Sequence, residues 1–146
     1  MSMKQLNTLL KFEKDKETQA AQELQLAENE HQQNISRLNG VAEYRLEYMK
    51  RLSERSITGV DSATFNHYHA FISKLDNASE QVEIAVRQAK ALAEKRRSLW
   101  FKQRQKVQAV EHLIAIKFKK MAIKEQKAEQ KMFDEIATQQ FIRRTM

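Results

Sequence analysis

The near absence of turn-forming residues constrains the fold of this chain more than any other feature of its sequence. The 146 residues include no proline and only two glycines, Gly40 and Gly59. Sheets and compact loops depend on Gly and Pro for their turns, so a chain with so few of them has little loop to build. The commonest residues, Lys, Glu, Gln, Ala, Leu and Arg, lose little conformational freedom in a helix. The sequence therefore predicts an all-α fold made of a few long helices.

Apolar residues recur at steps of three and four in both halves of the chain. The first half carries Leu10, Ala20, Leu24, Ala27, Ile35, Leu38, Val41, Tyr48 and Leu52, and the second carries Leu75, Val82, Val86, Ala89, Ala93, Trp100, Val107, Val110, Ile114 and Met121. Such spacing marks the seam of a left-handed coiled coil. Polar residues interrupt both tracks, namely Glu13, Glu17, His31, Ser79, Arg96, Gln103 and Lys117. We therefore expect a weakly packed coil whose register the polar positions hold.

Only the segment 56–62 breaks this helical pattern strongly. Gly59 suits the left-handed backbone that often follows a helix, and Asp61 or Ser62 can cap the next helix. Gly40 lies inside the first predicted helix. It is either a tolerated defect or a point where the facing helix approaches closely.

These signals predict a single coiled-coil domain over residues 1–146, folded as a long antiparallel two-helix hairpin. We expect helix one over about 3–56, the turn over about 57–61, and a longer helix two over about 62–138. Helix two then extends well beyond the reach of helix one. That C-terminal part is expected to fray or to fold against another chain.

The formal net charge of +7 is concentrated in the second half of the chain. Residues 87–131 hold fourteen basic and four acidic side chains, which indicates an acidic partner. Trp100 and Phe101 lie among these basic residues, so single-stranded nucleic acid is an alternative partner. Because the sequence shows no nucleic-acid-binding module, we favour an acidic protein surface and regard nucleic acid as unlikely.

The sequence shows no pattern typical of an enzyme. It lacks cysteine and any Gly-rich phosphate loop, and His67 and His69 are two residues apart, so on a helix they point in different directions. A two-helix coil also offers no concave pocket for a substrate. We expect no catalytic residue, no metal, no cofactor and no small-molecule ligand. With neither a signal peptide nor a membrane-spanning segment in view, we expect a cytoplasmic protein.

Aromatic residues gather on both sides of the predicted turn. They are Tyr44 and Tyr48 on helix one, and Phe65, Tyr68 and Phe71 on helix two, followed by Ile72 and Leu75. A hairpin that turns at Gly59 brings the two sets side by side. Two interpretations stay open, because the rings either seal the end of the hairpin or form an exposed protein-binding patch.

The residues around the turn resemble those of the flagellar FliJ proteins of bacterial type III export. The resemblance rests on Tyr44-x3-Tyr48, a turn containing Gly, Tyr68-x2-Phe71-Ile72-x2-Leu75-x2-Ala78, Trp100 in a basic stretch, and Gln130-Lys131-Met132-Phe133-Asp134-Glu135-Ile136-Ala137. It covers the whole chain in length and order. Each motif is weak by itself, and their combination carries the resemblance.

The resemblance implies an antiparallel coiled coil similar to the central stalk subunit of rotary ATPases. It implies docking in or on the hexameric ring of the flagellar export ATPase, and contact with the regulatory subunit of that ATPase. It also implies binding to the cytoplasmic domain of the export gate and escort of empty export chaperones. The protein would then act in flagellum biogenesis, motility and chemotaxis, peripheral to the inner membrane at the flagellar base. The hairpin fold itself predicts a monomer, whereas a generic dimerisation coil, the other alternative, predicts a homodimer. A similar stalk in a virulence type III secretion system is an alternative.

The resemblance also implies a gate-contacting patch near the turn. Carried over by matching positions, this patch comprises Tyr44, Tyr48, Phe71, Leu75 and Ala78, whereas Arg37 and Val82 depart from the family pattern at its outer edges. For the ATPase ring we expect a basic surface that faces acidic groups. The candidate residues are Lys117, Lys119, Lys120, Lys124, Lys127 and Lys131.

Overall fold

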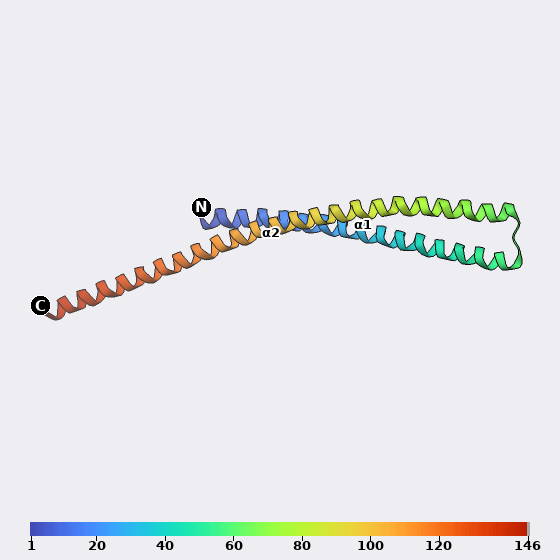
Figure 1. The fold of residues 1–146 in the computed structure, drawn as a ribbon. Helices are drawn as coiled ribbons and strands as arrows, with labels where there is room; N and C mark the ends of the chain where they lie inside the picture. The colour runs from blue at the N-terminus through green and yellow to red at the C-terminus, as the bar shows by residue number, and fades with distance from the viewer. Residues whose placement is uncertain (146) are drawn as a thin grey trace. The chain divides into compact units, whose positions relative to one another are not determined.

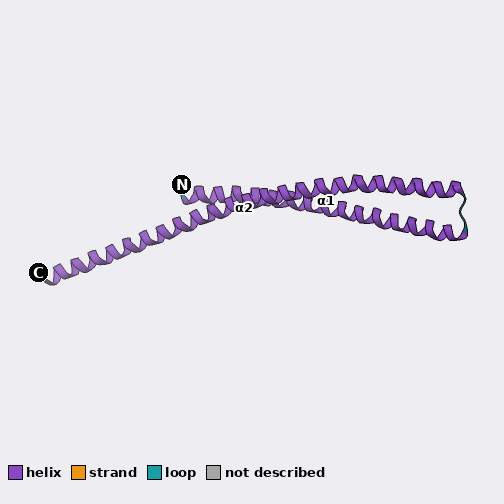
Figure 2. Ribbon diagram, in the orientation of Figure 1, coloured by secondary structure: helices purple, strands orange, loops and turns teal. Residues whose placement is uncertain are grey.

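The structure is a computed structural model that describes residues 1–145, and it consists of two α-helices (Figure 1). Helix α1 spans Met3–Thr58 and helix α2 spans Ser62–Thr145. The loop between them is Gly59, Val60 and Asp61 (Figure 2). The predicted all-α two-helix hairpin with a longer second helix is therefore confirmed.

Both helices continue beyond their predicted ends. Helix α1 ends at Thr58 rather than near 56, and α2 continues to Thr145 rather than ending near 138. Met146 lies outside the described residues. The prediction of a single domain over 1–146 stays a prediction.

A capping box starts helix α1. The backbone N–H of Gln5 donates to the Ser2 hydroxyl oxygen at 3.1 Å, and the Ser2 N–H donates to Gln5 Oε1 at 2.8 Å. These reciprocal bonds satisfy two donors that a helix start otherwise leaves unpaired. The Ser-x-x-Gln spacing at 2–5 is the sequence signal for this cap.

The turn follows the predicted chemistry at Gly59. Its φ is 90°, a left-handed backbone that residues with a side chain adopt only with strain. Asp61 is the cap of α2, because its Oδ1 accepts the N–H of Thr64 at 2.9 Å and its carbonyl accepts the N–H of Phe65 at 3.0 Å. The hydrogen bonds from Thr64 lower the pKa of the Asp61 carboxyl.

The close-approach interpretation of Gly40 is not supported. A methyl group built at Gly40 would meet no atom of the facing helix within 4 Å. Gly40 is therefore a tolerated glycine in the interior of α1, and it does not allow a tight helix crossing.

Contacts divide the hairpin into two compact units, which are described separately below. The hairpin unit is Thr18–Phe101 and contains the turn, and the terminal unit joins Met1–Glu17 to the part of α2 that starts at Lys102. In the hairpin unit the most buried seam residues are Ala27, Leu52, Ile72, Ala89 and Ala93, together with the polar Asn34. In the terminal unit they are Leu6, Val107 and Val110.

The predicted seam is almost entirely confirmed. All residues of the two apolar tracks are buried or half-buried except Met121, and so are the seven polar residues that interrupt them. Met121 is 46% exposed, so its assignment to the packed seam is wrong. Helix α1 starts only at Met3, and no part of it covers α2 that far along the terminal unit.

Candidate protein-binding surfaces

Four rings from both helices form one connected aromatic cluster in the hairpin unit. Tyr48 lies at its centre, with ring centroids 4.3 Å from Phe71, 5.2 Å from Tyr44 and 5.9 Å from Tyr68. Tyr44 also meets Phe71 edge to face at 6.1 Å. Such offset and tilted pairs add to the stability gained from burial alone. The cluster therefore joins α1 to α2 through contacts between rings of both helices.

The cluster is only partly covered. Tyr44 is 48% exposed, whereas Tyr48, Tyr68 and Phe71 are half-buried. Partial desolvation raises the pKa of the Tyr48 hydroxyl, and the neighbouring Tyr44 hydroxyl raises it further. The hydroxyls of Tyr44, Tyr48 and Tyr68 offer hydrogen-bonding groups at the edge of an apolar surface.

Arginines surround the aromatic cluster. The Arg51 guanidinium lies 5.8 Å from the ring centroid of Tyr48, and that of Arg55 lies 5.6 Å from Tyr68. Arg45 Nε donates to Asp76 Oδ1 at 2.6 Å, which forms an ion pair between the helices beside the rings. Arg51 Nη2 also pairs with Glu47 Oε1 at 2.8 Å. This surface thus combines exposed aromatic area with guanidinium groups, two of which are ion-paired, and Tyr and Arg are frequent in binding hot spots.

The structure brings together most of the patch predicted near the turn. Tyr44, Tyr48 and Phe71 are in mutual contact, Leu75 is half-buried in the seam, and Ala78 is exposed one turn further along α2. Sequence reasoning left Tyr68 outside the patch, yet its ring belongs to the cluster. The signal for Tyr68 was its seam spacing of four residues from Ile72.

Phe65 takes no part in the cluster. It is 42% exposed and its ring packs edge to face against His69, with centroids 4.4 Å apart. The sequence grouped it with the other rings because it shares their spacing on α2. Only the contacts show that it lies apart from them.

In the terminal unit, a polar contact and a short apolar seam hold the two segments together. Gln103 Nε2 donates to the Glu13 carbonyl oxygen at 3.0 Å and also to the Glu13 carboxylate. Both side chains are half-buried in the seam. No buried side-chain nitrogen or oxygen within residues 1–145 lacks a hydrogen-bond partner. The polar interruptions predicted for the seam are therefore satisfied where they are buried.

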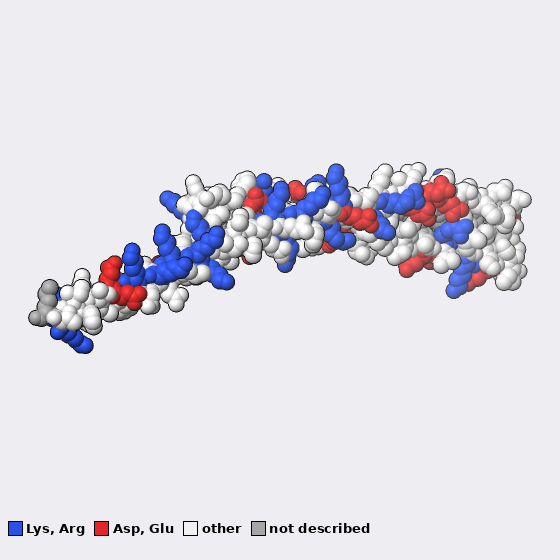
Figure 3. All heavy atoms as spheres, turned by 60° about the vertical axis from the view of Figure 1, so that its left-hand side comes forward, with Lys and Arg blue, Asp and Glu red and all other residues white. Residues whose placement is uncertain are grey.

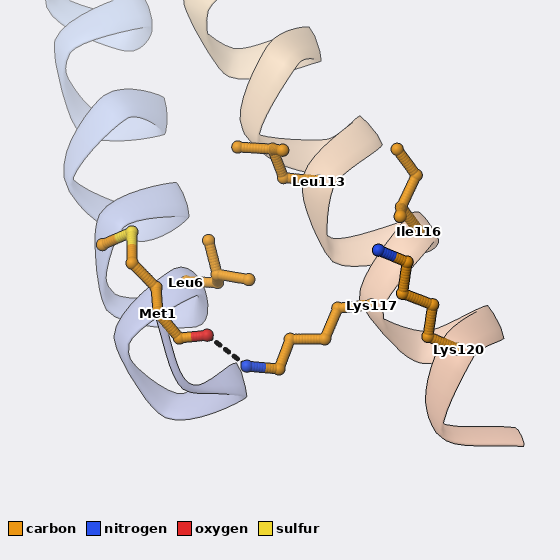
Figure 4. Close-up of a pocket in the computed structure, with 6 residues that line it drawn as sticks. All are labelled: Met1, Leu6, Leu113, Ile116, Lys117 and Lys120. Atoms are coloured by element: carbon orange, nitrogen blue, oxygen red, sulfur yellow. Dashed lines mark hydrogen bonds between the residues drawn. The ribbon is translucent and has the colours of Figure 1, made fainter. Parts of the chain in front are cut away.

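A small cavity lies at the N-terminal end of this seam (Figure 4). Its volume is about 380 Å³, and its lining residues are Met1, Leu6, Leu113, Ile116, Lys117 and Lys120. Lys117 Nζ donates to the Met1 carbonyl oxygen across the cavity. Lys117 is thereby half-buried, while the other five candidate lysines are exposed.

The six candidate lysines do not share one face of α2. Lys117, Lys120, Lys124, Lys127 and Lys131 follow one another at steps of three and four, so they form one stripe along the helix. Lys119 falls outside these steps and points to another face. Figure 3 shows basic side chains gathered over the visible face of this part of α2.

Part of the basic stretch in the hairpin unit is already paired within the chain. Arg96 Nη1 contacts Glu23 Oε2 at 2.9 Å, and Arg97 Nη2 contacts Glu28 Oε1 at 2.7 Å. Trp100 is half-buried in the seam. These contacts reduce the positive charge and the aromatic area available to nucleic acid, so they do not favour the alternative raised by the sequence.

The described residues hold no recognisable metal site. Within residues 1–145 no group of three or more His, Cys, Asp or Glu side chains is placed to hold a metal ion. No helix in the same range is both long enough and apolar enough to span a membrane.

Comparison with known proteins identifies the family. The sequence model described as "Flagellar FliJ protein" matches residues 3–146, which is nearly the whole chain. Neither the curated proteins nor the solved structures compared with this chain gave a match. The family match agrees with the resemblance noted in the residues around the turn and with the two-helix fold. The chain therefore belongs to the flagellar FliJ protein family and is a non-enzymatic, stalk-type component of the flagellar type III export apparatus.

Proposed function

We propose that the protein connects two parts of the export machinery through two surfaces. The aromatic cluster of the hairpin unit binds the cytoplasmic domain of the export gate, and the lysines of the terminal unit bind the ring of the export ATPase. The observation that carries this proposal is the four-ring cluster, which is built from both helices and leaves Tyr44 48% exposed.

The gate assignment is supported by the chemistry of the cluster. Rigid aromatic rings contribute a large contact area at low entropic cost, and Tyr and Arg are frequent in binding hot spots. Tyr44 and Ala78 are exposed, and Phe71 and Leu75 are half-buried, so all four side chains keep surface area that a partner can contact. We include Tyr68 in the proposed gate surface because its ring contacts Tyr48.

The ATPase assignment is supported by charge and exposure. Lys119, Lys120, Lys124, Lys127 and Lys131 are exposed on a part of α2 that α1 does not cover. Exposed clusters of one sign steer the approach of a partner of opposite sign and favour its binding. The ring opening would accordingly present acidic groups to this helix.

The resemblance to the family supports proposals for the remaining partners and for the location. The regulatory subunit of the ATPase and empty export chaperones are further proposed partners, and the place of action is the cytoplasmic side of the inner membrane at the flagellar base. The protein would act as a monomer and support motility and chemotaxis through flagellum assembly.

Alanine substitution of Tyr44, Tyr48 and Phe71 tests the division between the two surfaces. We expect gate binding to be lost and ATPase binding to be kept, both measured by pull-down with the purified partners. Phe65→Ala is the matched control, because it removes an exposed ring of the same unit from outside the cluster. Circular dichroism checks that the triple variant stays helical. Loss of both partners, or of neither, would contradict the proposal.

A further inference from the structure

The heptad seam of α2 continues beyond the point where α1 begins, at Met3. The steps of three and four that place Val107, Val110 and Ile114 in the seam lead on to further positions at the same spacing. These positions are Lys117, Met121, Lys124, Ala128 and Lys131, called here the extension seam. The helix that carries them is unbroken through Thr145.

Within residues 1–145, neither helix covers the extension seam beyond Lys117. Lys117 Nζ reaches the Met1 carbonyl oxygen, so the N-terminus lies at the start of this region. Every residue from Phe118 to Thr145 is exposed. A seam face with regular heptad spacing but no facing helix is a surface that another helix can complete.

The residues of the extension seam alternate in character. Lys117, Lys124 and Lys131 occupy one heptad position, while the small or apolar Met121 and Ala128 occupy the other. Lys120 and Lys127 lie directly beside them on the same stripe. The five lysines therefore span roughly 21 Å of helix, at the usual rise of 1.5 Å per residue.

Lysine at a seam position selects the partner. In either orientation a second copy of this chain would bring its own lysines into the same interface, and an excess of like charges at a helix interface is strongly disfavoured. A helix with carboxylates at the facing positions would instead form ion pairs, while its apolar residues would cover Met121 and Ala128.

We propose that the extension seam is a docking surface for an acidic amphipathic helix of another protein. This helix continues the coiled coil beyond the start of α1 at Met3. This inference rests on the proposed ATPase-binding role of the same segment and specifies its partner. The predicted partner helix alternates apolar residues with Glu or Asp at its seam positions. The lysines also keep the segment from pairing with a second copy of itself.

A designed peptide tests this surface without the export machinery. The probe is a fluorescently labelled helix of four heptads with Leu at one seam position and Glu at the other, and the comparison peptide has Lys in place of Glu. We expect fluorescence anisotropy to show binding of the Glu peptide to the full chain and no binding of the Lys peptide.

Charge-reversal variants test whether the Glu peptide binds at the extension seam. Lys124→Glu/Lys131→Glu should weaken binding of the Glu peptide by about tenfold or more, because like charges then meet inside a desolvated seam. The control Arg143→Glu/Arg144→Glu changes the net charge equally at two exposed residues of α2 that belong neither to the extension seam nor to the candidate lysines, and its affinity should stay within about threefold of the unaltered chain. Equal losses in both variants would show nonspecific charge attraction and overturn the inference.

Two further outcomes would overturn the inference. The first is no binding of the Glu peptide by the unaltered chain. The second is tighter binding of nucleic acid. A single-stranded oligonucleotide with the same charge as the Glu peptide would then displace the labelled peptide at a lower concentration than the unlabelled peptide does, which would show that the lysines bind phosphate groups.

The inference and the proposed function can fail separately. If the Glu peptide binds through Lys124 and Lys131 but the export ATPase does not bind, the ATPase assignment falls and the docking surface stands. If the export ATPase binds the Lys124→Glu/Lys131→Glu variant with unchanged affinity, the extension seam is not the surface that contacts the ATPase.

Discussion

The ring of Tyr48 on α1 stacks against the ring of Phe71 on α2, with centroids 4.3 Å apart and planes inclined by 25°. This pair joins the two helices in a seam whose most buried apolar residues are Leu52, Ile72 and three alanines. The rings of Tyr44 and Tyr68 also contact the ring of Tyr48. The proposed binding surface is therefore also a structural element of the hairpin unit.

Because Tyr48 contacts three rings and the exposed Tyr44 contacts two, their substitution should affect stability unequally. We expect Tyr48→Ala to lower the melting temperature by roughly 3–8 °C, and Tyr44→Ala to lower it clearly less. Thermal melts followed by circular dichroism provide the measurement. Equal shifts would contradict the central position of Tyr48.

The two glycines should respond to alanine in opposite directions. Gly59→Ala should destabilise the chain by about 1–2 kcal/mol, because alanine at a φ of 90° is strained. Gly40→Ala should stabilise it by about 0.5–1 kcal/mol, because the helix gains propensity and no atom of the facing helix is near. Urea denaturation of both variants measures the two signs. A destabilised Gly40→Ala would mean that the facing helix packs against this site.

The Asp61 cap of α2 should make the stability of the chain depend on pH in the acidic range. The folded-state pKa of Asp61 is lowered, so its stabilising contribution is complete above the unfolded pKa and is lost as the pH falls through the folded pKa. In Asp61→Asn the side chain still accepts the Thr64 N–H, but it does not titrate. The difference in melting temperature between the two proteins should therefore be constant at neutral pH and change only below about pH 4. A difference that changes between pH 6 and 8 would refute this origin.

Removing the lysines from the extension seam should promote self-association. In Lys124→Leu/Lys131→Leu the seam positions from Met121 to Lys131 become apolar or small, and a second copy can pack against them. Sedimentation velocity at several concentrations should show a monomer for the unaltered chain and a growing dimer fraction for the variant. The control is Lys119→Leu/Arg144→Leu, which adds apolar residues on another face and should remain monomeric. A variant that dimerises no more than this control would argue against the role given to the lysines.

Much of the candidate gate surface could be predicted from local patterns. Tyr44 and Tyr48 share a face because they are four residues apart, and Gly59 marks the turn that brings Phe71 toward them. Spacing could not separate Tyr68, whose ring joins the cluster, from Phe65, whose ring packs on His69 instead. That distinction depends on which face of α2 meets α1 and how closely.

The basic surface shows the same limit. The sequence singled out the lysines between 117 and 131 by their charge, but the exposure of Met121 was not anticipated. An apolar residue at a regular seam position is buried only where a facing helix exists, and α1 begins too late to supply one. The heptad repeat of α2 therefore continues in the sequence beyond the last residues that pack against α1.

The sequence by itself determined two long helices, the turn at Gly59, a cap at Asp61 or Ser62 and the heptad register of the seam. These features depend on backbone propensity, local hydrogen bonds and periodicity, all of which act between residues close along the chain. The tertiary structure decided which rings meet, that Lys117 reaches Met1, and where the seam loses its cover. Those outcomes depend on the alignment of residues far apart in sequence, which only the packing of α1 against α2 sets.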